Sequence, residues 1–139
     1  MTTKDTMIST PELAIQGVSQ PQIGRYFERL NAGDFQGTSA LFAPEGQLHP
    51  PFEEPVVGTE AIAAYLEAEA RGMKLSPVKG SMKTLENGDR EFSIRGSVQT
   101  PLFIVNVGWL FVLNPEGEIL SVTVKLLASL EELVNLRRS

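Results

Sequence analysis

The hydrophobic period of the chain changes once, near Gly72. Before it, in the segments that begin near Ser19 and Thr59, apolar residues recur at the spacing of one helix face. After it, apolar and polar residues alternate, as in strands with one solvated face. Helices followed by long strands define an α+β domain. We therefore expect a curved antiparallel sheet wrapped around the N-terminal helices, with a conical apolar cavity between them.

Two boundaries frame this domain. Residues 1–18 show little periodicity and many polar side chains, so we expect a flexible N-terminal arm there. Residues 19–139 are expected to form one domain, large enough for a real core and too small for two ordinary domains. The domain is expected to end in a short helix, "SLEELVNLRR", where Ser129 and Glu132 form a capping box.

Local signals set the limits of the expected helices. Ser19 is the expected N-cap of a helix whose apolar stripe includes Tyr26. A proline-rich segment, residues 43–58, is expected to be an ordered loop or edge segment rather than a helix. Thr59 is expected to cap the next helix, and Gly72 to stop it.

One segment of the strand half is apolar on both faces. This segment, "LFIVNVGWLFVLN", needs cover on both sides, whereas "REFSIRGSVQT" and "EILSVTVKLLA" alternate. In the last of these, we expect Leu120, Val122, Val124 and Leu126 on one side. The helices can cover one face of the apolar strand. We expect a second copy of the chain to cover the other, in a homodimer.

Composition argues against several classes of function. The net charge of −5 and the pI near 4.9 argue against a nucleic-acid partner. The chain has no cysteine and a single histidine, His49, so we expect no metal site and no thiolate chemistry. The sequence shows no signal peptide and no apolar stretch of spanning length, so we expect a cytoplasmic protein.

An enzyme that acts on a ketone in an apolar cavity would need a general base. The expected strands carry carboxylates only at their ends, at Glu91 and Glu118. Glu67 and Glu69 lie on a helix face, where we expect solvated charges. His49 has no Ser or Asp at the spacing of a catalytic triad. We therefore expect no catalytic residue.

Two amphipathic aromatic side chains remain as candidates for ligand binding. Tyr26 lies on the inner stripe of the first helix, and Trp109 lies on a strand that should cross the same cavity. Each carries a polar hydrogen that needs an acceptor when buried, and the run that begins at Val107 offers no side-chain acceptor before Asn114. The alternative is that both are core residues that donate to backbone carbonyls.

Five stretches of the sequence resemble one known family. They are "YFERLNAGDF", "ALFAPEGQLHPPFEEPVVG", "VQTP", "WLFVLNPEG" and "LLASLEELVNLRR". The same stretches follow one another in the C-terminal domain of the cyanobacterial orange carotenoid protein. The resemblance runs from about Gly17 to Arg138 and is closest to the stand-alone homologues of that domain, in the NTF2-like superfamily. It implies a ketocarotenoid ligand, such as canthaxanthin or echinenone.

The resemblance also implies a binding site. In the family, a Tyr and a Trp at the positions of Tyr26 and Trp109 donate hydrogen bonds to the keto oxygen of the carotenoid ring. Apolar side chains form a tunnel around the pigment. The matching positions here are Leu30, Phe42, Val57, Met73, Leu75, Pro101, Phe103 and Val124. The family carries a Trp after "VQTP" where this chain has Leu102, so the tunnel mouth is expected to differ.

The family role implied by the resemblance is to take up, carry and transfer a ketocarotenoid, in photoprotection and singlet-oxygen quenching. A carotenoid polyene approaches the thickness of a bilayer core, so one domain of this size cannot cover it. A homodimer is therefore expected to share the pigment. The other expected partners are a helical carotenoid-binding protein, homologous to the family's N-terminal domain, and, transiently, a membrane, which suggests association with thylakoids.

Two other functions stay open. One is a small-ligand enzyme of the ketosteroid-isomerase (SnoaL-like) type, which the expected lack of a carboxylate in the cavity disfavours. The other is a non-catalytic dimerisation module with a filled core. The positions of Tyr26 and Trp109 relative to a cavity distinguish these from a pigment carrier.

Overall fold

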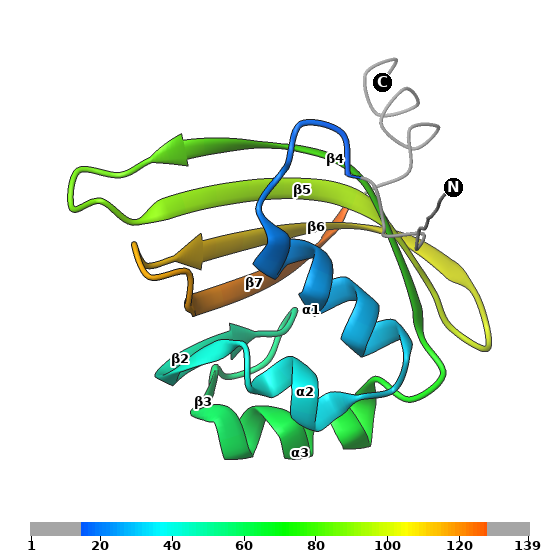
Figure 1. Cartoon of the computed structure of the whole chain (residues 1–139). Coiled ribbons are helices and arrows are strands. Elements are labelled where there is room, and N and C mark those ends of the chain that lie inside the picture. The colour runs from blue at the N-terminus through cyan, green and yellow to red at the C-terminus, as the bar shows by residue number, and fades with distance from the viewer. Residues whose placement is uncertain (1–14, 128–139) are drawn as a thin grey trace, which may run out of the picture.

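The change of hydrophobic period near Gly72 separates three helices from four long strands in the computed structural model, which describes residues 15–127 (Figure 1). The C-terminal helix expected in residues 129–138 lies outside the described residues. The helices are α1 (Pro21–Asn31), α2 (Phe35–Ser39) and α3 (Thr59–Glu69), and the long strands are β4 (Lys74–Thr84), β5 (Arg90–Gln99), β6 (Ile104–Leu113) and β7 (Ile119–Leu127). Two more strands, β2 (Phe42–His49) and β3 (Val56–Val57), lie between α2 and α3 in the sequence.

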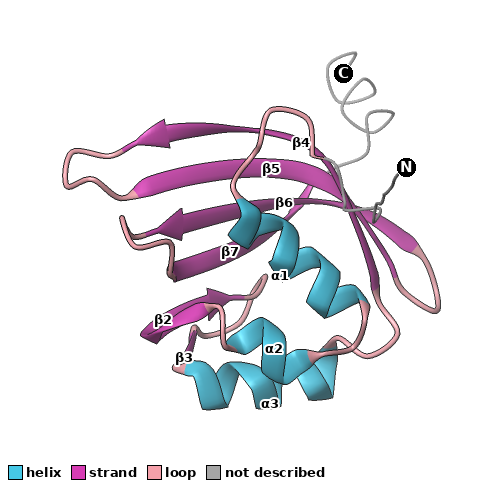
Figure 2. Ribbon diagram, viewed as in Figure 1, coloured by secondary structure: helices cyan, strands magenta, loops and turns pink. Residues whose placement is uncertain are grey.

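All six strands form one sheet in the order β3-β2-β7-β6-β5-β4. Figure 2 shows α1 lying across one face of this curved sheet, with α2 and α3 beside β2 and β3. The alternation expected in β5 is present, since Phe92, Ile94 and Val98 are buried while Ser93 and Arg95 are exposed. The expected α+β class, with a curved sheet against N-terminal helices, is confirmed.

The sheet is not wholly antiparallel. Residues 43–58 were expected to be a loop or an edge segment, but most of the first half forms β2, which pairs in parallel with β7. The pairing is irregular between Phe42 and Gln47, the stretch that contains Pro44. A proline has no N–H to contribute to a ladder, so the regular pairs begin at Gln47, beyond it.

A β-bulge in β7 shows that Leu120 does not lie on the inner face of the sheet, where the sequence pattern predicts it. Leu113 pairs with Ile119 and Val112 pairs with Ser121, which leaves Leu120 as an extra residue in β7. Ile119 is therefore fully buried in place of Leu120, whereas Val122 faces the core as expected. The pattern of alternation could not reveal this shift, because a bulge changes the register of all residues that precede it.

The helix ends differ from the expected caps. The helix α3 ends at Glu69 with Ala70 as its C-cap, two residues before the expected stop at Gly72. Gln20 rather than Ser19 is the N-cap of α1, and Gly58 rather than Thr59 is the N-cap of α3. Gly58 has a φ of 93°, a conformation that residues with a side chain rarely adopt. This backbone requirement explains why the glycine, and not the following threonine, precedes the helix.

Part of the expected N-terminal arm is attached to the sheet. Ile15 is buried in the core, and the N–H of Gln16 donates to the carbonyl of Val78 at 3.0 Å. The N–H of Gly80 donates back to the carbonyl of Gln16 at 2.8 Å. The flexible arm expected over residues 1–18 therefore does not extend over residues 15–18.

The two faces of β6 differ in burial. Val107, Trp109 and Phe111 face the helices and are buried, whereas Leu110 and Val112 on the opposite face are only partly buried. The expectation that a second copy of the chain covers this opposite face stays a prediction. No helix within residues 15–127 is long and apolar enough to cross a membrane.

Candidate functional site

Hydrogen bonds at both ends of α1 fix this helix on the sheet. Near its start, Gln22 Nε2 donates to the carbonyl of Gly117 at 3.3 Å. At its end, Asn31 Nδ2 donates to the carbonyl of Leu75 at 2.9 Å, and the N–H of Leu75 donates to Asn31 Oδ1 at 2.7 Å. Tyr26 lies midway between these attachments, so its position relative to the strands is well determined.

A cluster of aromatic rings joins Tyr26 to Trp109. The ring of Phe27 lies edge-on to both, with centroids 5.4 Å from Tyr26 and 4.8 Å from Trp109. Phe111 lies edge-on to Tyr26 at 5.0 Å. Edge-to-face pairs of this kind are favourable beyond their buried area. The cluster therefore holds the two candidate donors in one fixed arrangement, although they come from α1 and from β6.

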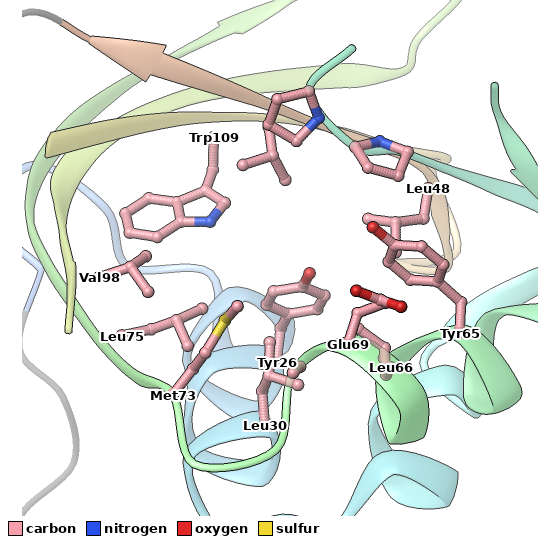
Figure 3. A pocket seen from close by; sticks show the side chains of 14 residues that line it. Tyr26, Leu30, Leu48, Tyr65, Leu66, Glu69, Met73, Leu75, Val98 and Trp109 are labelled. Carbon is pink, nitrogen blue, oxygen red and sulfur yellow. The ribbon is translucent and has the colours of Figure 1, made fainter. Parts of the chain in front are cut away.

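Tyr26 and Trp109 line one cavity of about 130 Å³ (Figure 3). Most of its wall is apolar. The residues that are buried, which we call the floor, are Tyr26, Leu30, Leu48, Pro50, Leu66, Ala70, Leu75, Val98 and Trp109. The less buried ones, which we call the rim, are Pro51, Tyr65, Glu69, Met73 and Val124.

The polar hydrogens of the floor have no acceptor in the described part of the chain. Tyr26 and Trp109 are each 2% exposed. Within residues 15–127, neither the phenol O–H nor the indole N–H forms a hydrogen bond, and Figure 3 shows both directed into the cavity. Leaving a buried donor unpaired costs about 1–3 kcal/mol. An apolar ring that carries an acceptor oxygen would satisfy both donors, so the floor fits a ligand of that type.

Burial also fixes the protonation state of Tyr26. It raises the pKa of the phenol far above its ordinary value, because the apolar surroundings destabilise the phenolate. Tyr26 is therefore a hydrogen-bond donor throughout the physiological pH range.

The rim carries polar groups of another kind. The Tyr65 hydroxyl donates to Glu53 Oε2 at 3.1 Å. Burial, this hydrogen bond and the charges of Glu53 and Glu69 raise the pKa of Tyr65 to about 12. The carboxylate of Glu69 belongs to the cavity wall. The expectation that no carboxylate lies on this wall is therefore wrong, because α3 turns the side chain of Glu69 toward the cavity and not away from it.

The predicted tunnel positions divide into two groups. The cavity wall contains Leu30, Met73, Leu75 and Val124. The others are absent from it: Phe42, Val57, Pro101 and Phe103. Phe42 packs behind Tyr26, with ring centroids 6.2 Å apart, while Val57 and Phe103 are more than half exposed. Val57 lies in the short edge strand β3, and Pro101 and Phe103 lie at the β5–β6 turn.

The sequence contained signals for two wall residues that were not predicted. Tyr65 and Glu69 are four residues apart on α3, so they lie on the same side of the helix. Glu69 is exposed, as expected of a solvated charge, yet it also lines the cavity, and Tyr65 is partly buried there. His49 does not line the cavity, and no group of three or more metal-binding side chains occurs within residues 15–127.

Comparison with known proteins defines the class first. The model of the SnoaL-like domain matches residues 23–98, more than half of the chain. The chain therefore belongs to the SnoaL-like family, within the NTF2-like fold. It is also homologous to the C-terminal domain of the orange carotenoid protein, as its sequence indicates. It is 40% identical over 134 residues to the orange carotenoid-binding protein of Synechocystis, an alignment that covers 94% of this chain and 42% of that protein.

The solved structures agree with this relationship. The orange carotenoid protein of Anabaena (Nostoc) sp. PCC 7120 binding canthaxanthin superposes with a TM-score of 0.83 at 36% identity, over 90% of this chain and 41% of that one. The chain thus spans less than half the length of these relatives. An enzyme also matches: the epoxide hydrolase LasB of Streptomyces lasalocidi is 48% identical over 48 residues, which is 34% of this chain and 17% of the enzyme.

Proposed function

We propose that this protein binds a ketocarotenoid by its terminal keto ring, with Tyr26 and Trp109 donating hydrogen bonds to the keto oxygen. The observation that carries the proposal is the pair of buried donors that face a mostly apolar cavity without an acceptor within residues 15–127. The homology to a protein that binds canthaxanthin supports it. Two donors favour a keto ring over a plain hydrocarbon ring, because only the former pairs them.

The size of the cavity limits how much of the pigment one chain can enclose. At about 130 Å³ it is close to the apolar cavity of about 150 Å³ that accommodates benzene. One chain therefore encloses a ring end, and the polyene extends beyond the rim. Exposed apolar surface of that length is unfavourable in water. A second copy of the chain covers the rest in a homodimer, on this proposal.

A homodimer of this kind would carry the pigment between other binding sites. We propose that the protein takes up the carotenoid from thylakoid membranes, carries it in the cytoplasm and transfers it to a helical carotenoid-binding protein. Its physiological purpose would be photoprotection through the quenching of singlet oxygen. The support for these steps is the homology, together with the open rim through which a ring end can enter and leave.

Expression in cells that make canthaxanthin tests the binding step. The purified wild-type protein is expected to be coloured and red-shifted, because donors at the carbonyl polarise the conjugated chain. The Tyr26→Phe/Trp109→Phe double variant is expected to retain less than about a tenth of the pigment, since each lost hydrogen bond to the buried oxygen weakens binding. Tyr65→Phe is the matched control, because Tyr65 is the other tyrosine of the chain and its hydroxyl already donates to Glu53.

Two results would contradict the proposal. One is a colourless wild-type protein that is folded and dimeric, which would favour the dimerisation module. The other is equal pigment content in the double variant and the control. Apo protein gives a second measurement, because Trp109 is the sole tryptophan and its fluorescence should be quenched when a polyene binds beside it.

One observation favours a second candidate, a small-ligand enzyme. The cavity wall contains a carboxylate, Glu69, which is a group that a general base requires. The short match to an epoxide hydrolase points the same way. Turnover of a small ketone or epoxide that is lost in Glu69→Gln, yet persists in Trp109→Phe, would establish this candidate over the pigment carrier.

A further inference from the structure

We infer that the cavity selects a ring that bears a hydroxyl group next to its keto group, with Glu69 as the residue that recognises the hydroxyl. The inference rests on the proposed ketocarotenoid binding and specifies the class of ring. Its basis is the way in which hydrogen-bond donors and acceptors are distributed around the cavity. Tyr26 and Trp109 offer donors from α1 and β6, whereas the polar groups of α3 offer acceptors.

Both polar groups of α3 lack a hydrogen to offer a ligand. The Tyr65 hydrogen is already donated to Glu53, at 3.1 Å, so the phenol oxygen is left as an acceptor. Glu69 is a carboxylate and can only accept. The two groups lie on the same side of α3, four residues apart, and both line the cavity. The α3 side of the cavity therefore presents acceptors alone.

Glu69 is available to a ligand. The nearby cation on the chain, Arg71, pairs with Glu67 at 3.0 Å. Within residues 15–127, Glu69 forms neither an ion pair nor a hydrogen bond. In the view of Figure 3, the Glu69 carboxylate points toward the cavity, and the Tyr26 hydroxyl lies between it and the Trp109 indole.

The order of these groups matches an α-hydroxyketone. In the view of Figure 3 the α3 acceptors lie on the far side of the Tyr26 hydroxyl from Trp109, so in the inferred pose the keto oxygen accepts from Tyr26 and Trp109 and the substituted neighbouring ring carbon faces α3. A hydroxyl there donates to Glu69, a hydrogen bond strengthened by the charge. A ring with only a hydrogen at that carbon places apolar surface against the Glu69 carboxylate. The carboxylate then loses hydrogen bonds to water and gains none from the ligand. Both effects favour the hydroxylated ring.

Titration of the apo protein with two detergent-solubilised pigments tests the inference. Canthaxanthin carries the keto group alone, and astaxanthin carries the hydroxyl beside it. Quenching of Trp109 fluorescence is expected to give a dissociation constant for astaxanthin on the order of tenfold lower than for canthaxanthin. Glu69→Ala is expected to reduce the ratio to about one. Glu67→Ala is the matched control, two residues away on the same helix and paired with Arg71, and should preserve the ratio.

Equal affinity for the two pigments in the wild type would overturn the inference, and so would an unchanged ratio in Glu69→Ala. Either result leaves the proposed function standing if canthaxanthin binding still depends on Tyr26 and Trp109. If the wild-type protein is folded and neither pigment binds, the proposed function itself fails. Glu69→Gln refines the result, because its amide oxygen accepts without a charge and should give an intermediate ratio.

Discussion

The two tyrosines of the chain line the same cavity in opposite environments. Tyr26 on the floor is 2% exposed, and within residues 15–127 its hydroxyl has no acceptor. Tyr65 on the rim is only partly buried, and its hydroxyl donates to Glu53. Floor and rim thus differ in whether the tyrosine hydroxyl beside the apolar wall has an acceptor within the protein. The rim satisfies its hydroxyl within the protein, and the floor keeps its donors available for a ligand.

The floor and the rim therefore have different roles: the floor positions the two donors, and the rim is where a ligand would enter. The floor lies in the aromatic cluster and holds Tyr26 and Trp109 rigidly, so a ring that enters meets two donors already in place. The rim consists of side chains that are partly buried or exposed, so fewer packing contacts hold them than hold the floor. The comparison predicts large effects for changes at the floor and small ones at the rim.

The largest effect is expected for Phe27→Ala. Phe27 is fully buried and contacts both donors of the floor, so its removal leaves a large void. We expect a loss of about 3–5 kcal/mol in the free energy of unfolding, measured by urea titration. Phe52→Ala is the control, because Phe52 is 93% exposed and its removal should change stability by less than about 0.5 kcal/mol. Equal losses would show that the aromatic cluster behind the floor stabilises the fold no more than an exposed ring beside the rim.

A second effect appears at alkaline pH. An unfolded tyrosine loses its proton near pH 10, while burial raises the pKa of Tyr26 in the folded protein. Above pH 10 the unfolded state therefore binds fewer protons than the folded one, and stability falls as the pH rises, by up to about 1.4 kcal/mol per pH unit for this group. Unfolding curves between pH 9 and pH 11.5 (roughly the range where tyrosine titrates) should show this slope.

The same curves in single variants sharpen the comparison. Tyr26→Phe is expected to flatten the alkaline slope. Tyr65→Phe should change it less, because the Tyr65 phenolate would be partly solvated. A slope that is the same in the wild type and in Tyr26→Phe would show that the floor hydroxyl does not set the alkaline limit.

A smaller effect is expected for the floor hydroxyl at neutral pH. In the pigment-free protein, Tyr26→Phe removes an unpaired buried hydroxyl, so stability should stay the same or rise by about 1 kcal/mol. The same variant should bind the pigment less tightly. Thermal unfolding with and without canthaxanthin measures both. A loss of stability above about 1 kcal/mol without pigment would reveal an acceptor for this hydroxyl and remove the basis for the proposed contact.

The parts of the fold that depend on local pattern could be predicted from the sequence. The alternation in β5 and the apolar stripe of α1 each follow from their own residues. The strand β2 could not be found in this way. Its proline and glycine are typical of a loop, and its pairing partner β7 is distant in sequence. Local signals describe what a segment can form, and a distant partner decides what it does form.

The site shows the same limit. Tyr26 and Trp109 were predicted by their chemistry and by family resemblance, and they do line one cavity. The buried face of α3 follows from its apolar spacing, since Ile62 and Leu66 are buried in the core. Spacing alone puts Glu69 on the same side of α3 as Tyr65, but only the tertiary structure shows that this side borders the cavity. That the acceptors gather on the α3 side of the cavity therefore becomes visible only in the tertiary structure.

The smallest effect concerns the backbone next to the rim, at Phe52. Phe52 follows the wall residues Pro50 and Pro51 and has a φ of 62°, which a residue with a side chain adopts at a cost of about 1–2 kcal/mol. Phe52→Gly and Phe52→Ala remove the same exposed ring, but only glycine relieves the backbone. We expect Phe52→Gly to be more stable than Phe52→Ala by up to about 1 kcal/mol, since the freedom that glycine gains in the unfolded chain offsets part of the relief. Equal stability of the two variants in urea titrations would mean that the backbone at Phe52, next to the rim, is not strained.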